Sequence, residues 1–217
     1  MRQRALFRVG ACALAGLVLL AGATAAAAQT GGVGAGTSEQ PTGQPAADGT
    51  YYDYWFGARD LRLGMAGEDV KTLNWLLRGL ALGTPFHGSF QSPTDGAVRD
   101  FQASVGVARD GVVRKSTRKK LAGRMQGQMA SWYGPGFYGN RTACGQTLTR
   151  KTIGVAHKKL PCGSRVVFAY EGRWARAKVI DRGPFIAGRT WDLTARLAER
   201  LGTIPVGTAE VKAVVAP

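Results

Sequence analysis

The spacing of apolar residues changes once along the chain, shortly before residue 128. Between Leu61 and Leu121, apolar side chains recur at intervals of three and four, the period of a helix with one buried face. From Gln128 onward they alternate with polar or small residues, the period of a half-buried strand. The pattern therefore predicts a helical segment followed by a β-rich segment.

Glycine-rich breaks divide the first segment into three predicted helices. Glu68 and Asp69 favour a helix N-terminus, and Ser92-Pro93 has the form of a second helix start. Ser116 is expected to cap a third helix that runs to Leu121. The first helix is expected to bury Leu61, Leu63, Val70, Leu73, Leu76 and Leu77. These signals together predict a compact bundle of three short helices.

The second segment reads as several short strands and one helix. The runs 165–170 and 174–180 are β-rich and are joined by Glu171-Gly172-Arg173, which predicts a hairpin. Residues 129–133 and 209–215 have the spacing of strands, and residues 194–201 read as a helix that ends at Gly202. Short strands with glycine turns over so short a segment predict a small closed barrel.

The first 28 residues have the form of a secretory signal peptide. Arg2, Arg4 and Arg8 precede an apolar run over residues 11–22, and small residues for cleavage follow at 23–28. The apolar run is too short for a membrane span. We therefore expect an exported chain, in the cell wall or another extracytoplasmic space, with no stable membrane anchor.

A flexible linker with an aromatic end is predicted over residues 29–58. Residues 29–50 are dense in Gly, Pro, Ser and Thr and show no apolar period. An aromatic cluster follows at 51–56. It is expected either to pack over the next domain or to offer flat faces on which sugar rings stack.

The net charge of +15 is carried by the two segments predicted to fold. Residues 59–128 contribute +6 and residues 129–217 contribute +9. Such a surface attracts polyanions. Because the chain is predicted to be exported and carries no recognition motif, we expect anionic wall polymers as partners and no nucleic acid.

Two cysteines remain if the signal peptide is removed together with Cys12. An even pair in an exported protein favours a disulfide between Cys144 and Cys162. Two free thiols or a metal pair are the alternatives, but the spacing is not that of close metal ligands. We expect no metal and no cofactor.

Within a domain predicted over residues 59–124, the span from Leu61 to about Leu121 resembles a known family. The elements that carry the resemblance are LRLGMAGEDVKTLNWLL, GSFQSPTDGAVRDFQASVGVARDGVV and STRKKL. They are similar to the small peptidoglycan-binding domain appended to many wall enzymes. The resemblance implies that Phe101 and Gln102 are candidate ligand contacts, although packing with a satisfied hydrogen bond is an alternative for both.

Residues 128–217 resemble a second family, through four motifs that occur in order. They are ASWYGPGFYGNRTACG, AHKKLPCGSRV, VIDRGPF and WDLTARLAERLG. They are similar to the double-psi β-barrel of the rare lipoprotein A family, which comprises secreted lytic transglycosylases and wall proteins of bacteria. The resemblance implies a small three-helix peptidoglycan-binding bundle followed by a six-stranded double-psi β-barrel.

The resemblance also implies three catalytic positions, which correspond to Gln146, His157 and Asp181. The first departs from the family, because TACGQ stands where TASGE is usual. An amide donates hydrogen bonds but does not exchange a proton near neutral pH. Asp181 is therefore the acid–base candidate, supported by His157 and Gln146.

Other side chains in the same motifs remain open between two roles. Asp181 is equally suited to capping the Gly183-Pro184 turn, and His157 to a packed, hydrogen-bonded position. Asp192 is expected either to cap a helix or stabilise the barrel, or to act as a second carboxyl. The candidate substrate contacts are Tyr133, Phe137, Tyr138, Arg182 and Asp192, with barrel-mouth packing as the alternative for the aromatic residues.

These features predict an exported protein that acts on peptidoglycan. The favoured function is a lytic transglycosylase that cleaves the β-1,4 bond between N-acetylmuramic acid (MurNAc) and N-acetylglucosamine (GlcNAc), with Asp181 as acid and base. The alternative is an expansin-like wall-binding protein without catalysis, because Gln146 replaces the usual Glu. A third class is an inhibitor or a partner-docking module. It stays open because such proteins share the double-psi barrel, and a fold alone does not decide function.

Overall fold

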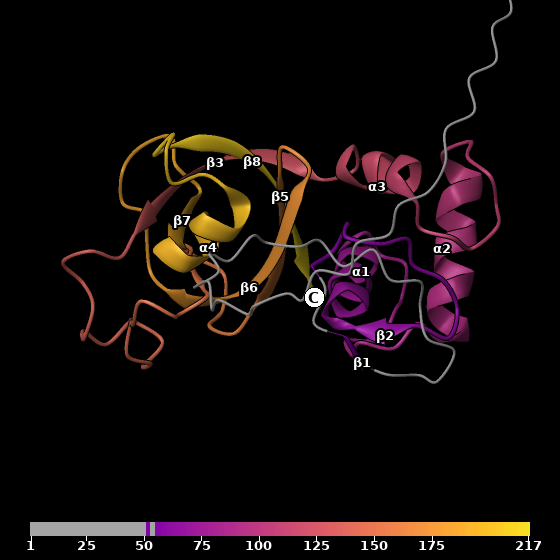
Figure 1. Cartoon of the computed structure of the whole chain (residues 1–217). Coiled ribbons are helices and arrows are strands. Elements are labelled where there is room, and N and C mark those ends of the chain that lie inside the picture. Colours follow the sequence, from indigo (N-terminus) through magenta and orange to yellow (C-terminus); the bar gives the residue numbers. More distant parts are fainter. Residues whose placement is uncertain (1–50, 53–54) are drawn as a thin grey trace, which may run out of the picture. The chain divides into compact units, whose positions relative to one another are not determined.

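The computed structural model describes residues 51–52 and 55–217 (Figure 1). The predicted signal peptide and residues 29–50 of the predicted linker lie outside the described residues. None of the helices in the described part has the length and apolar content needed to cross a membrane.

Three helices and a short parallel strand pair form the first part of the described chain. Strand β1 (Tyr51–Tyr52) pairs with β2 (Ala66–Gly67), immediately before helix α1. The three helices, which confirm the predicted bundle, are α1 (Glu68–Gly79), α2 (Ser92–Ser104) and α3 (Lys115–Ala122).

The start of α1 differs from the prediction. Leu61 forms a β-bridge with Val113, and Leu63 is 54% exposed, so neither belongs to the helical face. Gly64 turns the chain with φ +90°, a conformation that L side chains rarely adopt. The helix then begins at Glu68, where the buried carboxylate of Asp69 accepts a 2.7 Å hydrogen bond from Arg59 Nε.

The third helix also starts differently. Ser116 lies inside α3, and the residue at the N-cap position is Arg114, whose side chain makes no capping hydrogen bond. The predicted cap at Ser116 is therefore wrong. In α2, by contrast, Pro93 stands in the first turn as predicted, where its missing N–H would have no helical partner.

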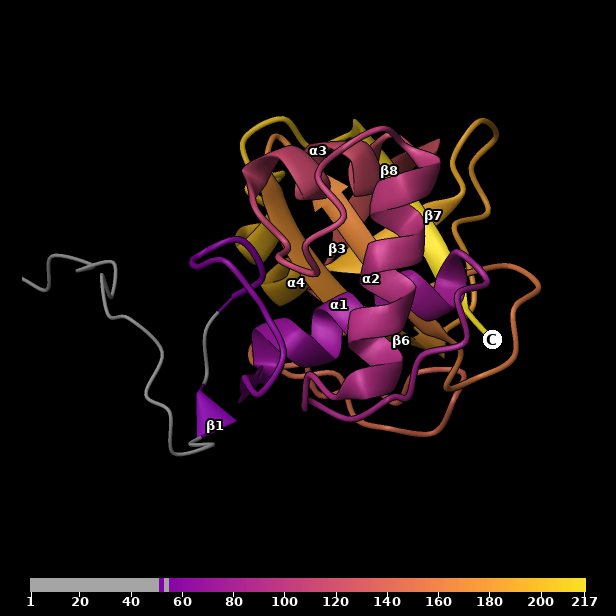
Figure 2. The same ribbon diagram turned by 90° about the vertical axis from the view of Figure 1, so that its right-hand side faces the viewer.

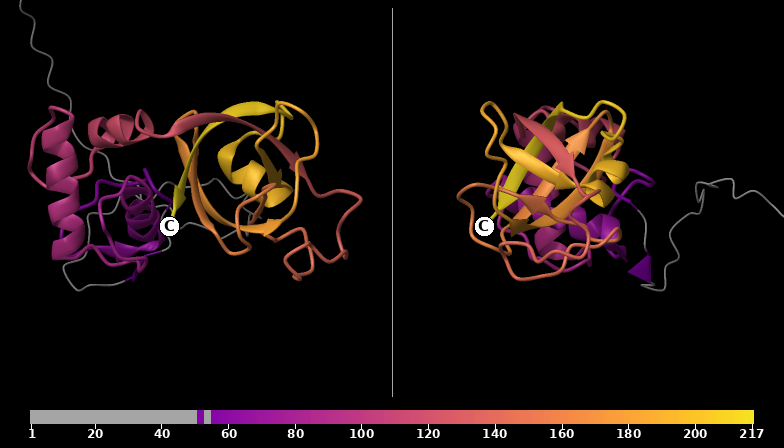
Figure 3. Two further views of the ribbon diagram at one scale, coloured as in Figure 1. Left: turned by 180° about the vertical axis from the view of Figure 1, so that it is seen from behind. Right: turned by 90° about the vertical axis from the view of Figure 1, so that its left-hand side faces the viewer.

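A closed barrel of six strands follows the helices, in the order β3-β7-β4-β6-β5-β8. Strands β3–β7 and β4–β6 pair in parallel and the other neighbours are antiparallel. Figure 3 shows these strands curving around one another. Their bounds are β3 Gln126–Tyr133, β4 Val155–Ala156, β5 Arg165–Tyr170, β6 Arg173–Asp181, β7 Trp191–Thr194 and β8 Ala209–Ala216.

The predicted hairpin between β5 and β6 is confirmed. Its loop is Glu171-Gly172, with φ +46° and +80°. Two residues at positive φ are what a type I′ turn needs, and this turn matches the twist of the flanking strands.

The barrel has its own apolar core, closed by helix α4 (Ala195–Leu201). Trp191 of β7 packs edge-on against Phe168 of β5, with ring centroids 5.3 Å apart. Thr194 caps α4 by accepting a hydrogen bond from Leu197 N. Asp192 is therefore not the cap of this helix, which removes one of the two structural roles predicted for it.

A second apolar core includes residues from both the helices and the barrel. Trp174 of β6 packs edge-on against Phe56 at 5.1 Å, and Glu68 of α1 forms an ion pair with Arg176 of β6. Helix α1 contacts both β5 and β8 (Figures 1 and 2). The three-helix bundle and the barrel therefore share buried surface, although each was predicted as a separate compact segment.

Candidate functional site

The ends of three neighbouring strands bring two carboxylates together. In strand pairing, Ala156 of β4 lies opposite Asp181 of β6 on one side and opposite Asp192 of β7 on the other. The register of β4 shifts between Val155 and Ala156, which brings Asp181 level with Ala156. Burial is the main cause that raises the pKa of Asp192, and the charge of Asp181 adds a smaller rise, so the two carboxyl groups lie within electrostatic range.

Tyr133, at the end of β3, faces both carboxylates. Its hydroxyl is buried and makes no hydrogen bond among the described residues. Burial, then the charge of Asp181 and its carboxylate as a hydrogen-bond acceptor, and then the charge of Asp192, raise the pKa of this phenol. The Tyr133 hydroxyl therefore lies close to two acids and within reach of the Asp181 carboxylate, although no hydrogen bond of normal geometry joins them. A buried polar atom without a partner is uncommon enough to mark a functional position.

Asp181 is held by main-chain amides on one oxygen only. Its Oδ1 accepts hydrogen bonds from Ala143 N at 2.8 Å and from Arg182 N at 2.9 Å. No hydrogen bond of normal geometry reaches Oδ2 from the described residues, and the Tyr133 hydroxyl is the nearby group that can turn toward the carboxylate. The capping role considered for Asp181 is thus partly realised, while its second oxygen remains available to a substrate.

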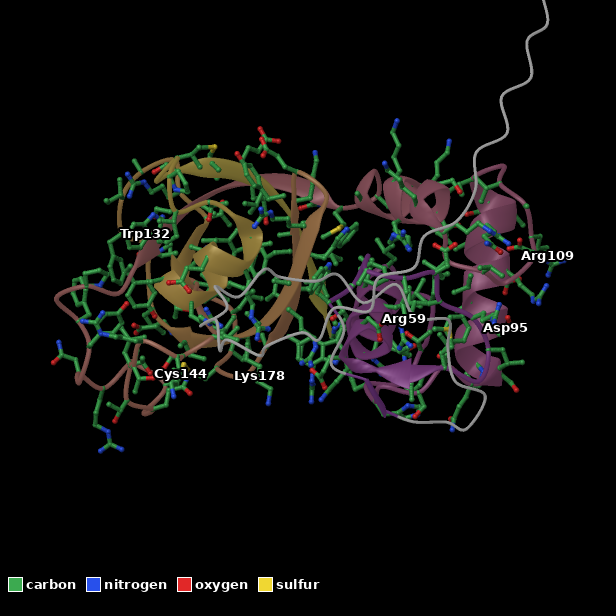
Figure 4. The ribbon with its side chains drawn as sticks, in the orientation of Figure 1. Arg59, Asp95, Arg109, Trp132, Cys144 and Lys178 are labelled. Atoms are coloured by element: carbon green, nitrogen blue, oxygen red, sulfur yellow. A yellow bond between two sulfur atoms is a disulfide. The ribbon has the colours of Figure 1, made fainter. Side chains whose placement is uncertain are left out.

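The predicted disulfide between Cys144 and Cys162 is confirmed, with a Cα–Cα distance of 5.7 Å. It joins two loops that flank the end of β6, one of which Figure 4 marks at Cys144. Cys144 N donates to Ile180 O, and Gly163 N donates to Val179 O. The disulfide therefore supports the loop that supplies the Ala143 amide to Asp181.

Gln146 lies on the disulfide-anchored loop but is not locked in place. Its side chain is exposed and makes no hydrogen bond within the described residues, while its carbonyl accepts one from Thr142 N at 2.8 Å. Gln146 is thus in the turn that holds Asp181, three residues after Ala143. The side-chain amide of Gln146 faces solvent, where a ligand can contact it.

The imidazole of His157 has one committed nitrogen and one free nitrogen. Nδ1 accepts hydrogen bonds from Lys159 N at 3.1 Å and Leu160 N at 3.0 Å, so in the neutral ring the proton resides on Nε2. The ring lies against Trp191, with centroids 4.6 Å apart. Burial, followed by the charges of Arg182 and Lys158, lowers the His157 pKa.

Asp192 is oriented by Ser131, which was not among the predicted site residues. Ser131 Oγ donates a 2.8 Å hydrogen bond to Asp192 Oδ1, across the β3–β7 pair. Burial is the main cause that raises the Asp192 pKa, against the lowering effects of Ser131 and Arg189. The alternation of Ser131 and Tyr133 on β3 is the sequence signal that places both on one side of the strand.

Exposed apolar side chains occur on the loops beside these strand ends. Phe137 is 55% exposed and lies edge-on to Tyr133 at 6.2 Å, and Phe185, after the cis Gly183-Pro184 bond, is 83% exposed. Tyr138 lies under the guanidinium of Arg150 at 5.4 Å. Arg182 reaches back to Cys162 Sγ at 3.5 Å. Phe185 was not singled out from the sequence, because its exposure depends on the loop conformation.

The two candidates in the helical part are not accessible. Phe101 is 4% exposed and Gln102 is 1% exposed. Gln102 donates to Val112 O at 3.0 Å and accepts from Gly111 N at 2.9 Å, which holds the turn after α2. The structure fits the packing alternative for both residues, since neither side chain reaches the surface where a ligand would bind.

Comparison with known protein families agrees with this architecture. Residues 125–213 match the family model described as lytic transglycolase, and residues 66–121 match the one described as putative peptidoglycan binding domain. By fold and domain order the chain is thus a double-psi β-barrel protein with a preceding peptidoglycan-binding domain. Over part of its length the chain is similar to proteins named RlpA (rare lipoprotein A).

Curated relatives match somewhat less than half of the chain. The chain is 41% identical over 90 residues to the "Probable endolytic peptidoglycan transglycosylase RlpA" of Synechocystis, covering 41% of this chain and 28% of that protein. It is 37% identical over 101 residues to the "Endolytic peptidoglycan transglycosylase RlpA" of Neisseria meningitidis, covering 46% and 42%. The chain therefore spans less than half the length of these relatives.

Solved structures give weaker matches. An expansin from Clavibacter michiganensis shares 19% identity over 43% of this chain and 50% of that chain, with a TM-score of 0.36. The Streptomyces papain inhibitor shares 21% identity over 44% of this chain and 96% of that chain, with a TM-score of 0.37. At these scores the matches carry no argument about function.

Proposed function

We propose that this chain is an extracytoplasmic lytic transglycosylase that cleaves the β-1,4 bond between MurNAc and GlcNAc in peptidoglycan. The observation that carries the proposal is the group of Asp181, Asp192 and the buried Tyr133 hydroxyl at the ends of β6, β7 and β3. The relatives named as peptidoglycan transglycosylases supply the substrate class. On this proposal, residues 59–124 bind the wall and residues 128–217 cleave it.

The reaction needs a proton on the departing oxygen and removal of a proton from the attacking one. The bond between MurNAc C1 and GlcNAc O4 breaks as O4 receives a proton. The C6 hydroxyl of the same MurNAc attacks C1 and loses its proton, which leaves a 1,6-anhydro end. One carboxyl can give the first proton and accept the second.

Asp181 is proposed as that acid and base. Its Oδ1 is fixed by the amides of Ala143 and Arg182, so its Oδ2 can meet the substrate in a defined orientation. Asp192 is proposed as a second carboxyl, because its raised pKa lets it keep a proton at higher pH than a free aspartate. Tyr133 is proposed to donate a hydrogen bond from its hydroxyl to a sugar oxygen beside the two carboxyl groups.

His157 and Gln146 are proposed as positioning residues. The N–H at Nε2 of His157 is the free donor of a ring whose other nitrogen is already bonded. Gln146 offers an exposed amide on the loop that holds Asp181. Phe137, Tyr138 and Arg182 complete the proposed substrate contacts, with aromatic faces suited to the apolar faces of sugar rings.

Digestion of purified sacculi, with mass spectrometry of the soluble fragments, tests the activity. The wild-type protein is expected to release fragments that end in 1,6-anhydro-MurNAc. Asp181→Asn is expected to reduce their release at least about a hundredfold, as for loss of a general acid–base group. Circular dichroism of the variant checks its fold. A folded wild-type protein that releases no such fragments between acidic and neutral pH would refute the activity.

One observation favours a second candidate, an expansin-like protein that binds or loosens the wall without cleaving it. Gln146 occupies the position where active members of the resembling family carry Glu, and its side chain is exposed with no partner among the described residues. If this candidate is right, Asp181→Asn sediments with insoluble wall as well as the wild type does. Neither protein would then release fragments.

A further inference from the structure

The helical domain carries a hollow whose lining includes none of the proposed catalytic residues. It lies between the end of α2 and the face of α3 and has a volume of about 520 Å³. Its lining includes Val105, Val107, Ser116, Lys119, Lys120 and Arg124. This size is within the range that holds a ligand of a few residues.

Three cations border the hollow without neutralising partners. Lys119, Lys120 and Arg124 are exposed, and none forms an ion pair or side-chain hydrogen bond within the described part of the chain. The neighbouring Arg118 differs, because it donates to the carbonyls of Arg59 and Val113. The cations at the hollow are thus available to an external anion.

The helix itself directs these groups toward the hollow. Ser116, Lys119 and Lys120 are three and four residues apart on α3, and positions at this spacing share one face of a helix. Helix α3 contains no acidic residue that could compete for the lysines. The Ser116 hydroxyl makes no hydrogen bond among the described residues and adds a neutral donor to the same face.

The floor of the hollow is apolar. Val105 follows the last turn of α2 and Val107 lies two residues further, and both are only partly buried. The ligand should therefore present small apolar groups next to its negative charges. The glycan strand of intact peptidoglycan carries methyl groups but no free carboxylate, because each lactyl carboxyl is amide-bonded to a peptide. A polyol phosphate carries charge but no methyl groups.

We propose that this hollow binds the stem peptide of peptidoglycan, which carries alanine methyl groups and free carboxylates along one short chain. The carboxylates meet Lys119, Lys120 and Arg124, and the methyl groups cover Val105 and Val107. The inference rests on the proposed action on peptidoglycan and adds that the helical domain recognises the peptide, while the barrel acts on the sugar.

Binding of a synthetic N-acetyl-Ala-γ-Glu-Lys-Ala-Ala pentapeptide to the full chain, measured by calorimetry, tests the site, because the acetyl group replaces the lactyl amide and leaves the peptide with a net negative charge. Lys119→Glu/Lys120→Glu is expected to raise its Kd at least about tenfold. The control Lys178→Glu/Arg200→Glu changes the net charge equally on the barrel, where Figure 4 marks Lys178, and is expected to stay within about twofold of the wild type. If both double variants weakened pentapeptide binding equally, the effect would come from the overall charge of the protein, and the proposed binding site would be overturned.

A second variant tests the apolar floor without a change in charge. Val107→Ser removes methyl contacts at a partly buried position, and we expect it to raise the pentapeptide Kd about three- to tenfold with an unchanged melting temperature. An unchanged Kd would overturn the role of the floor. Stronger competition by poly(glycerol phosphate) than by the pentapeptide would overturn the peptide as ligand.

The same proteins separate this inference from the proposed activity. On glycan strands stripped of peptide, Lys119→Glu/Lys120→Glu should release 1,6-anhydro fragments as the wild type does, and on intact sacculi it should release them more slowly. Fragment release by a wild type that does not bind the pentapeptide would refute the hollow alone. Peptide binding by a wild type that releases no fragments would refute the activity alone.

Discussion

The hydrogen bonds of His157 restrict what the side chain can do in the proposed site. Two main-chain N–H groups point at Nδ1, so a proton on that nitrogen would oppose both donors. Burial, followed by Arg182 and Lys158, also lowers the pKa of the ring. His157 is therefore suited to donate a hydrogen bond from Nε2 and poorly suited to cycle through the imidazolium form.

Two substitutions at His157 separate its structural and functional roles. Asn can place an oxygen near the Nδ1 position but lacks the Nε2 donor, whereas Ala lacks both. We expect His157→Asn to unfold near the wild-type temperature and His157→Ala to lose about 1–2 kcal/mol of stability. Both should lose fragment release if Nε2 positions substrate. Full activity in His157→Asn would assign the residue to structure alone.

Asp192 should make the stability of the fold depend on pH more strongly than an asparagine at the same position would. Because its folded pKa is raised above 3.8, its contribution to stability is present below that value and is lost as pH rises through the folded pKa. Asp192→Asn should therefore melt above the wild type at about pH 7 and approach it at about pH 3. Buried Asp69 also has a raised pKa but is common to both proteins. A melting difference that stays constant with pH would contradict the assignment.

Restoring a carboxylate at position 146 tests whether the amide limits the reaction. Gln146→Glu adds an acid on the loop that supplies the Ala143 amide to Asp181. We expect an increase of about tenfold or more in 1,6-anhydro fragments, by analogy with the contribution of a general acid–base group. Because Gln146 is exposed, the substitution is expected to leave the fold intact. Gln128→Glu is unsuitable as a control, because Gln128 Oε1 accepts a hydrogen bond from Trp191 Nε1. Gln126→Glu, on the exposed start of β3, is the matched control.

At the scale of elements, the site depends on loops that are fastened to a rigid barrel. The loop after β3 is joined to the loop after β4 by the disulfide and to the end of β6 by the bond from Cys144 N to Ile180 O. The strands fix where Asp181 and Asp192 emerge, and the loops orient Asp181. Loss of the loop tether should therefore affect activity more directly than it affects the barrel.

Removal of the disulfide tests this division. Cys144→Ser/Cys162→Ser opens a loop with a sequence separation of 18, and the expected loss of stability is about 3 kcal/mol. We expect fragment release to fall by more than the unfolded fraction accounts for, because the Ala143 amide loses its support. Fragment release in proportion to the folded fraction would show that the disulfide stabilises the fold without orienting Asp181.

At the scale of the whole described molecule, helix α1 and the barrel contact one another closely. A Cβ added at Gly79 of α1 would lie 2.8 Å from Val214 Cγ2 and 3.0 Å from Val215 O. The helix and β8 can thus approach only because position 79 has no side chain. The shared core predicts that the helical domain and the barrel unfold together in one transition.

Alanine at two helical glycines provides a matched test of that contact. Gly79→Ala should lower the free energy of unfolding by about 1–3 kcal/mol, because strand β8 must move. Gly96→Ala, in α2, meets nothing within 4 Å and should raise it by about 0.5–1 kcal/mol. Thermal unfolding measures both. Two separate transitions in the wild type, or a neutral Gly79→Ala, would contradict a shared core.

Much of the architecture followed from local patterns in the sequence. Helical spacing and the Pro93 start signal identified α2, strand spacing identified β5 and β6, and the even cysteine pair predicted the disulfide. Each depends on residues close in sequence or on a chemical pairing rule, so no knowledge of the tertiary fold was needed. The error before α1, at Leu61 and Leu63, arose because a bridge to Val113 and the turn at Gly64 override a periodic pattern. The error at Ser116 arose because α3 begins one residue earlier, at Lys115, directly after the strand-like segment that holds Val113.

The composition of the site was decided by contacts that no local pattern specifies. Asp181 and Asp192 become neighbours because each strand end pairs with Ala156, and Tyr133 is buried beside them because β3 pairs with β7. The sequence alone determined which residue types, strands and helices are present. Only the tertiary structure decided which polar groups are buried together, because burial and pairing across the barrel set both their hydrogen bonds and their pKa directions.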